Sequence, residues 1–212
     1  MRIHEPIKNY IHTKHPQGSV TQWFGENKVL YSRWGLDGHN GIDIVAPHGT
    51  PLLAVEDGII VSVKLSPDGF GKHVRLRSTK KYQGKYRCWV YGHCSEILVT
   101  EKQKVKAGDT IALMGNTGFV VSGANPWWKT NPYAGTHLHL GMRYLIPDEK
   151  GWKYPGDTIR YEVDNYDNGV KGAVNFQFLL EPEVPQVNKD MWQQLLTIQS
   201  IINSLKVKFG VK

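Results

Sequence analysis

Short segments in which apolar and polar residues alternate, separated by turns, are the feature that most restricts the fold of this chain. The alternation is clear in 59–65 and 73–77, and the chain holds 22 glycines and 11 prolines. A period of two is typical of half-buried strands, and Asp57-Gly58 is a strong hairpin signal. The pattern predicts one inward face in the first segment, formed by Ile59, Val61, Val63 and Leu65. We therefore expect a mainly β protein, with an antiparallel sheet that forms a sandwich or a partly open barrel.

The charge and the apolar content of the chain narrow its possible partners. A net charge of +7 favours polyanions, but the basic residues are scattered and form no arginine-rich helix, so specific nucleic-acid binding is not expected. No run of about 18 apolar residues predicts a membrane span. The N-terminus lacks the apolar stretch of a signal peptide, so we expect synthesis in the cytoplasm. Cys88 and Cys94 are expected to be free thiols, because residues six apart on a strand cannot form a disulfide.

Composition divides the chain into four parts. Residues 1–18 form a polar N-terminal arm, 19–180 the main domain, 181–187 a proline-rich linker and 188–212 an amphipathic helix. The predicted helix carries an apolar stripe with helical spacing, formed by Met191, Leu195, Ile198, Ile202 and Leu205. This stripe is suited to docking on the domain or to self-association with another copy of the chain.

Two histidines, His137 and His139, lie two residues apart in an alternating segment. On a strand their side chains leave the same face, while Leu138 and Leu140 leave the other face and can enter a core. Such a pair is consistent with an exposed polar face, with two ligands of one metal, or with one ligand and one proton-transferring group.

A second group, His39 and Asp43, lies in a glycine-containing turn that leads into a strand. Together with His139 it offers two nitrogens and one oxygen, and three protein ligands with a fourth position for water are typical of catalytic zinc sites. His137 is then placed to take a proton from the attacking water, and His93 to act as a second proton donor or to contact an oxyanion. The alternative for His39 and Asp43 is an ordinary turn.

The segment 119–135 is longer than a simple turn and leads directly into the His137 strand. It contains three aromatic residues that we expect to line a substrate groove: Trp127, Trp128 and Tyr133. The alternative is a surface loop that packs on itself.

Five sequence segments resemble the lysostaphin-type (LytM-like) zinc metallopeptidases, which cut peptide bonds in bacterial peptidoglycan. They are GHNGIDIVAPHGTP (38–51), the Asp57-Gly58 pair, YGHCSEI (91–97), VKAGDTIALMGNTG (105–118) and THLHLG (136–141), within a motif core of 20–144. The resemblance implies an antiparallel β domain with one zinc ion at the floor of a groove. It also implies that His39, Asp43 and His139 are the zinc ligands.

The same resemblance implies that His137 acts as general base and His93 as transition-state stabiliser in a zinc endopeptidase. Tyr31 is a candidate for a groove tyrosine of that family. The implied substrate is a peptide of peptidoglycan cross-links or stems, and the implied place of action is the bacterial cell wall, with a phage-encoded or virion-associated enzyme among the options. The alternative is a catalytically silent module of the same fold that serves in cell-wall binding, regulation or virion structure.

Overall fold

The computed structural model describes residues 2–120, 132–181, 194, 196–199 and 201. Its β-strands pair antiparallel, which confirms the mainly β, antiparallel fold, and a short helix lies near the C-terminus. Contacts divide the chain into two units, with the boundary between Glu181 and Pro182. No described helix has the length and apolar character needed to cross a membrane.

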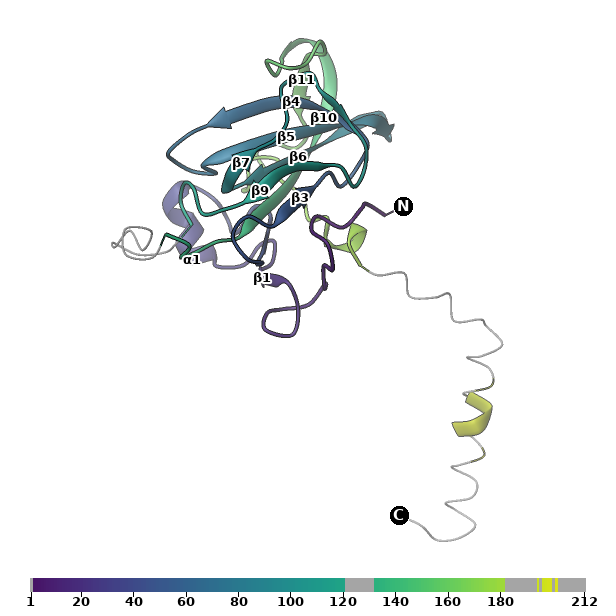
Figure 1. Cartoon of the computed structure of the whole chain (residues 1–212). Coiled ribbons are helices and arrows are strands. Elements are labelled where there is room, and N and C mark those ends of the chain that lie inside the picture. The colour runs from purple at the N-terminus through teal and green to yellow at the C-terminus, as the bar shows by residue number, and fades with distance from the viewer. Residues whose placement is uncertain (1, 121–131, 182–193, 195, 200, 202–212) are drawn as a thin grey trace. The chain divides into compact units, whose positions relative to one another are not determined.

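The larger sheet forms the body of the first unit (Figure 1). Its strands follow the order β1-β2-β10-β6-β5-β4-β8, and β11 pairs with β10. Their bounds are β1 Val20–Gln22, β2 Ile42–Ile44, β4 Gly58–Leu65, β5 Lys72–Tyr82, β6 Lys85–Gly92, β8 Lys104–Val105, β10 Leu138–Trp152 and β11 Tyr161–Val163.

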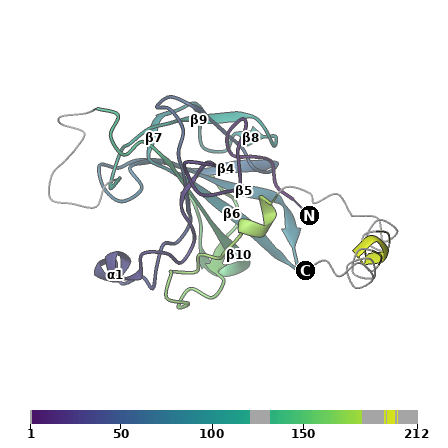
Figure 2. The same cartoon turned by 90° about the horizontal axis from the view of Figure 1, so that it is seen from below.

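A smaller sheet covers one face of the larger one. It has the order β3-β9-β7, with β3 Pro51–Leu53, β7 Cys94–Ile97 and β9 Thr110–Met114. Figure 2 shows β7 and β9 to one side of β5, β6 and β10. Fully buried side chains of both sheets, among them Leu138 and Leu140 of β10 and Ile111 and Met114 of β9, join in one apolar core between them. The other face of the larger sheet is left for the functional site.

The pairing register decides which residues share that second face. His139 of β10 lies opposite Asp43 of β2 on one side and Gly92 of β6 on the other. Gly141 and Arg143 follow His139 on the same face, because side chains alternate along a strand. Further along, a small apolar cluster of Val61, Cys88, Leu145 and Tyr161 closes this face. Cys88 and Cys94 are free and buried, as expected.

Two local expectations from the sequence are wrong. Asp57-Gly58 does not join two paired strands, because β3 belongs to the small sheet and β4 to the large one. The β4 strand also contains a bulge between Ile60 and Ser62, which shifts the alternation by one residue. As a result Ile60 and Val63 contact the main core, whereas Ile59 and Val61 contact the small cluster. Leu65, the last residue of the strand, is 75% exposed instead of facing inward.

Short elements before β2 were not expected from the alternating pattern. The chain forms α1 at Lys28–Tyr31 and a 3-10 helix at Ser32–Trp34, and Gly35 ends the latter with a left-handed φ of 68°. A second 3-10 helix lies at Gln177–Leu179.

The N-terminal segment lies against the main domain. Ile7 is buried in the main core, and the backbone N–H of His4 donates to the carbonyl of Val55 at 2.8 Å. In the second unit, residues 194, 196–199 and 201 are helical. The linker residues 182–187 and most of the predicted apolar stripe lie outside the described residues, so self-association through this helix stays a prediction.

Candidate metal centre and active site

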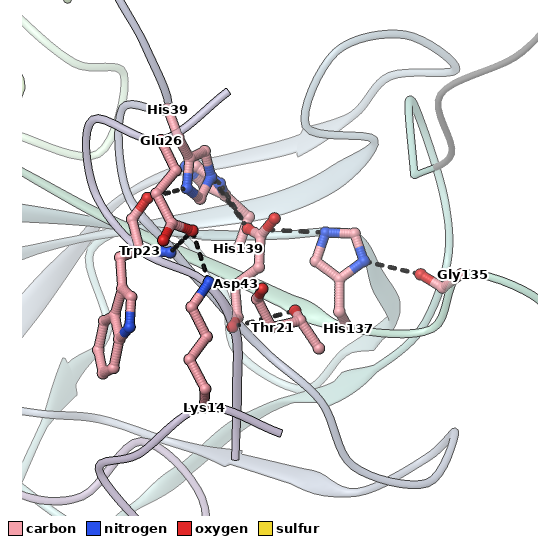
Figure 3. A network of polar contacts seen from close by, with 9 residues as sticks. All are labelled: Lys14, Thr21, Trp23, Glu26, His39, Asp43, Gly135, His137 and His139. Atoms are coloured by element: carbon pink, nitrogen blue, oxygen red, sulfur yellow. Dashed lines mark hydrogen bonds and ion pairs between the residues drawn. The ribbon is translucent and has the colours of Figure 1, made fainter. Parts of the chain in front are cut away.

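Three side-chain atoms form a tight triangle on the open face of the large sheet (Figure 3). Nε2 of His39 lies 3.0 Å from Nδ1 of His139 and 3.1 Å from Oδ1 of Asp43, and the third edge, between His139 and Asp43, is 3.2 Å. All three residues are buried, and their donor atoms form a possible metal site. Zinc ligands bound at about 2.0–2.1 Å in a tetrahedron lie about 3.3 Å apart, which is close to these edges.

Strand pairing brings these residues together from distant parts of the sequence. Asp43 and His139 are direct cross-strand partners in the β2–β10 pair, so their side chains leave the same face side by side. His39 precedes β2 and reaches the site across Gly41. A Cβ atom at Gly41 would lie 2.7 Å from Nε2 of His139, so a glycine is needed where the two chains approach.

His39 is oriented by hydrogen bonds on its far side. Its Nδ1 donates to the carbonyl oxygen of Trp23 at 3.2 Å, and the backbone N–H of Trp23 donates to Glu26 at 2.8 Å (Figure 3). Glu26 is paired in turn with Lys14 at 2.6 Å. Partners of this kind fix the ring orientation and the tautomer of a metal-ligating histidine.

The tautomer of His39 indicates whether the three donor atoms suit a cation. Because Nδ1 of His39 donates to a carbonyl, the neutral ring presents a lone pair at Nε2 to the carboxylate of Asp43 at 3.1 Å. A lone pair facing a carboxylate oxygen at that distance is repulsive unless a proton or a cation lies between them. A divalent cation shared by the three donor atoms fits this arrangement.

The electrostatic surroundings favour the metal-binding protonation states. Burial raises the pKa of the Asp43 carboxyl, but the neighbouring His137, His39 and His139 outweigh burial and hold that pKa well below its usual value. Burial lowers the pKa of His139 to about 4. Near pH 7 the site therefore offers a carboxylate at Asp43 and a neutral imidazole at His139, the forms that bind zinc.

Two further histidines flank the triangle, and both are held through Nδ1. His137 donates from Nδ1 to the carbonyl of Gly135 at 2.7 Å, and its Nε2 lies 3.7 Å from Oδ1 of Asp43. His93 donates from Nδ1 to the carbonyl of Thr117 at 2.7 Å. The two rings are 4.5 Å apart at their centroids. Each neutral ring thus keeps a lone pair at Nε2, as a proton acceptor requires.

His93 lies at the point where the chain passes from one sheet to the other. It falls between the end of β6 and the start of β7, with a left-handed φ of 63°, and its N–H donates to the carbonyl of Phe70 at 2.7 Å. Burial, with His137 and His139 nearby, lowers the pKa of His93 to about 3. A strained backbone conformation at a buried histidine is typical of functional sites.

Two cavities meet at the site. One cavity, of about 630 Å³, is lined by His137 and by residues that include Pro47, His48 and Tyr133. The other, of about 470 Å³, runs past His93 and His139 toward Tyr31, Trp34 and Arg143. Asp43 and His137 line both cavities, so a chain molecule lying through both would pass over the triangle.

The structure also locates the predicted groove residues. Tyr31 ends α1 and lies against His39, with ring centroids 5.3 Å apart. Tyr133 is exposed and contacts His48, with centroids at 5.0 Å. Trp127 and Trp128 lie outside the described residues, so their contribution to a groove stays a prediction.

Sequence reasoning missed several residues that shape the site. Trp23 and Thr117 act through backbone carbonyls, which leave no side-chain signal in a sequence. Arg143 had a usable signal, because it continues the alternation of His137, His139 and Gly141 on one face of β10.

The buried triangle of two histidines and one carboxylate, with two further histidines beside it, is a candidate metal site of the kind that metal-dependent hydrolases use. A sequence-family comparison gives the family. Residues 37–153, more than half of the chain, match Peptidase family M23, and the chain belongs to this family. This confirms the metallopeptidase resemblance of the motifs.

The names of individual relatives indicate different activities. The chain is 36% identical over 104 residues to the peptidoglycan DD-endopeptidase ShyA of Vibrio cholerae, which covers 49% of this chain and 20% of that protein. It is 32% identical over 127 residues to the murein hydrolase activator NlpD of Escherichia coli, covering 59% and 28%. A solved structure, the catalytic domain of the antimicrobial peptidase lysostaphin from Staphylococcus simulans, matches with 25% identity and a TM-score of 0.41, covering 59% and 76%. The chain spans between about a fifth and two fifths of the length of the curated relatives it matches.

Proposed function

We propose that this protein is a zinc-dependent endopeptidase that hydrolyses peptide bonds in bacterial peptidoglycan cross-links or stem peptides. The observation that carries the proposal is the triangle of donor atoms, 3.0–3.2 Å on each edge, next to two histidines anchored through Nδ1. We assign His39, Asp43 and His139 as the ligands of one zinc ion. Membership of a peptidase family, and similarity to a protein named as a peptidoglycan endopeptidase, support the substrate class.

Zinc bound there would lower the pKa of water and polarise a carbonyl group. His137 acts as general base, because its Nε2 keeps a lone pair directed toward the ligand cluster while Gly135 holds the ring. His93 stabilises the transition state. Thr117 fixes one proton on Nδ1, so Nε2 donates to the developing negative charge only after it takes a proton from the adduct of water and substrate. The lowered pKa of His93 means that this imidazolium forms only while that negative charge is present.

The substrate peptide lies through the two cavities that meet at Asp43 and His137. Tyr133 lines the larger of the two cavities and Tyr31 the smaller. We assign both to substrate contact together with Trp127 and Trp128. The protein acts at the bacterial cell wall, and its C-terminal helix attaches it to a partner or to a second copy. A phage or virion enzyme is compatible with this assignment.

A second candidate function is a catalytically silent module that binds or regulates at the cell wall. The similarity to NlpD, a protein named as a murein hydrolase activator, favours it. Silence in this fold requires loss of a ligand or of a base. All five residues are present in this chain. The three proposed ligands form the triangle, His137 lies 3.7 Å from Asp43, and the His93 ring lies 4.5 Å from that of His137, which favours the enzyme.

The decisive experiment compares wild-type protein with His139→Ala for zinc content and for release of muropeptides from purified peptidoglycan. We expect about one zinc per chain and cleavage for the wild type, and loss of both in the variant. Wild-type protein without stoichiometric zinc, or equal cleavage by the variant, would overturn the mechanism.

A companion variant, His137→Ala, separates the roles of the two histidines on the same strand. It should retain zinc and lose turnover by roughly 10²–10⁴-fold, the usual contribution of a general base. Loss of the metal instead would mean that His137 is a ligand.

A further inference from the structure

Two arginines extend the site face of the large sheet away from the metal ligands. Arg143 follows His139 and Gly141 on the same face of β10, and Arg75 of β5 is linked to Gly141 through Val90 in the sheet register. Arg143 is partly buried and lines the same cavity as His139, His137 and His93. Lys171 lines that cavity as well.

Neither arginine has an acidic partner among the described residues. The two buried arginines do have an acidic partner, since Arg77 pairs with Asp157 at 2.6 Å and Arg87 pairs with Glu56. Arg75 lies near the rings of Phe70 and Tyr154, at 5.9 and 5.8 Å from their centroids. Burial, and next the charge of Arg75, lower the pKa of Arg143. Arg75 lies in register with Gly141, two residues from Arg143 on the same face. Two cations on one partly buried face are costly unless an anion joins them.

The cavity itself supplies no such anion. Asp43 is the one acidic residue among the described residues that line it, and its carboxylate already faces three histidines. A guanidinium can bind a carboxylate with two parallel hydrogen bonds, which makes arginine well suited to this ligand. Because the cavity leads directly to the reacting centre, the anion that fits belongs to the substrate.

We propose that Arg143, supported by Arg75 and Lys171, binds a free carboxylate of the substrate peptide and makes the enzyme selective for cross-links that carry one within a few residues of the scissile bond. This inference rests on the proposed peptidase function. Arg143 lies four steps along the strand from His139, about 13 Å, so the carboxylate lies roughly two to four residues from the bond that is cut. A glycine bridge, which has no carboxylate along its length, is then a poor substrate.

The test uses cross-linked muropeptide dimers in two forms, native and with their free carboxylates converted to carboxamides. We expect zinc-loaded wild-type protein to cleave the native form with a kcat/KM about tenfold or more higher, mainly through KM, because charge-assisted hydrogen bonds are lost on amidation. In Arg143→Gln this preference should fall to within about twofold, with zinc content unchanged. Lys80→Gln, which removes an exposed charge on β5 outside both cavities, should keep the wild-type preference.

Equilibrium binding separates failure of this inference from failure of the proposed function. The same two dimers are titrated into zinc-loaded His137→Ala protein, with and without Arg143→Gln. Tighter binding of the native dimer, abolished by Arg143→Gln, supports the carboxylate site even if no form of the protein cleaves. Equal binding of the two dimers, or a preference that survives Arg143→Gln, overturns it whatever the cleavage assay gives.

Discussion

His93 shows at the scale of one residue how the fold accepts strain at the site. A histidine at a φ of 63° lies in the left-handed region, where an L-residue with a side chain is disfavoured. Two hydrogen bonds fix it there, one from its backbone N–H to Phe70 and one from its ring to Thr117. The backbone conformation aims the imidazole at His137, and a regular strand would not.

We therefore expect His93→Gly to be more stable than His93→Ala by about 1 kcal/mol, because glycine adopts the left-handed region without penalty. Urea unfolding of the two zinc-loaded variants measures the difference. Both variants should bind zinc and have strongly reduced turnover. Equal stability of the two would mean that the backbone at residue 93 is not strained.

At the scale of elements, the two faces of β10 have different roles: one packs in the core and the other carries the residues of the proposed site. Leu138, Leu140 and Met142 enter the core against the small sheet, while His139 and Arg143 leave the opposite face. The partners β2 and β6 complete the arrangement, since they place Asp43 and Gly92 beside His139. The buried side chains on one face of β10 thus fix the position of the site residues on its other face.

Leu140→Ala should accordingly destabilise the protein by about 2–4 kcal/mol without changing zinc stoichiometry at temperatures where the variant is folded. Leu140 is fully buried, and truncation of a buried leucine loses transfer free energy and leaves a cavity. Denaturant unfolding and metal analysis of the same sample test both parts. A folded variant that has lost its zinc would contradict the division of roles between the two faces.

The sequence predicts this strand well because its information is local. Alternation identifies the faces of 136–144, and the spacing of His137 and His139 places both on one face. The partners of the strand depend on long-range pairing, which no local pattern encodes. The β4 bulge and the split around Asp57-Gly58 were missed for that reason, and the carbonyls that hold His93 and His137 come from turns without a side-chain signal.

For the whole molecule, a bound metal is expected to contribute to stability. Removal of zinc leaves a buried carboxylate facing imidazole lone pairs, and any ligand of the folded state stabilises it by mass action. Free zinc at 100 times its Kd should add roughly 2.7 kcal/mol, or a rise in Tm of about 5–10 °C. Differential scanning calorimetry with zinc and with a chelator measures the shift, and His139→Ala is the control that should show none.

The boundary at Glu181 leads to a prediction about the second unit. A protein that ends at Glu181 should retain zinc and cleave muropeptides in solution at the wild-type rate, because the ligands, the bases and both cavities lie within the first unit. Sedimentation of the full chain and of the shortened protein tests self-association. If the shortened protein loses zinc or activity, the second unit is part of the catalytic domain.

The two faces of β10 also bear on how a protein of this kind changes over evolutionary time. The three proposed metal ligands are not members of the main apolar core, and the core residues of β10 face away from the proposed site. A single substitution at a ligand can therefore end hydrolysis while the cleft and the fold persist, and stability lost with the metal is recoverable elsewhere in the chain. Descent from enzyme to a non-hydrolytic peptide-binding protein is accordingly a short mutational path in this architecture, and the arginine-lined cavity would be inherited along it.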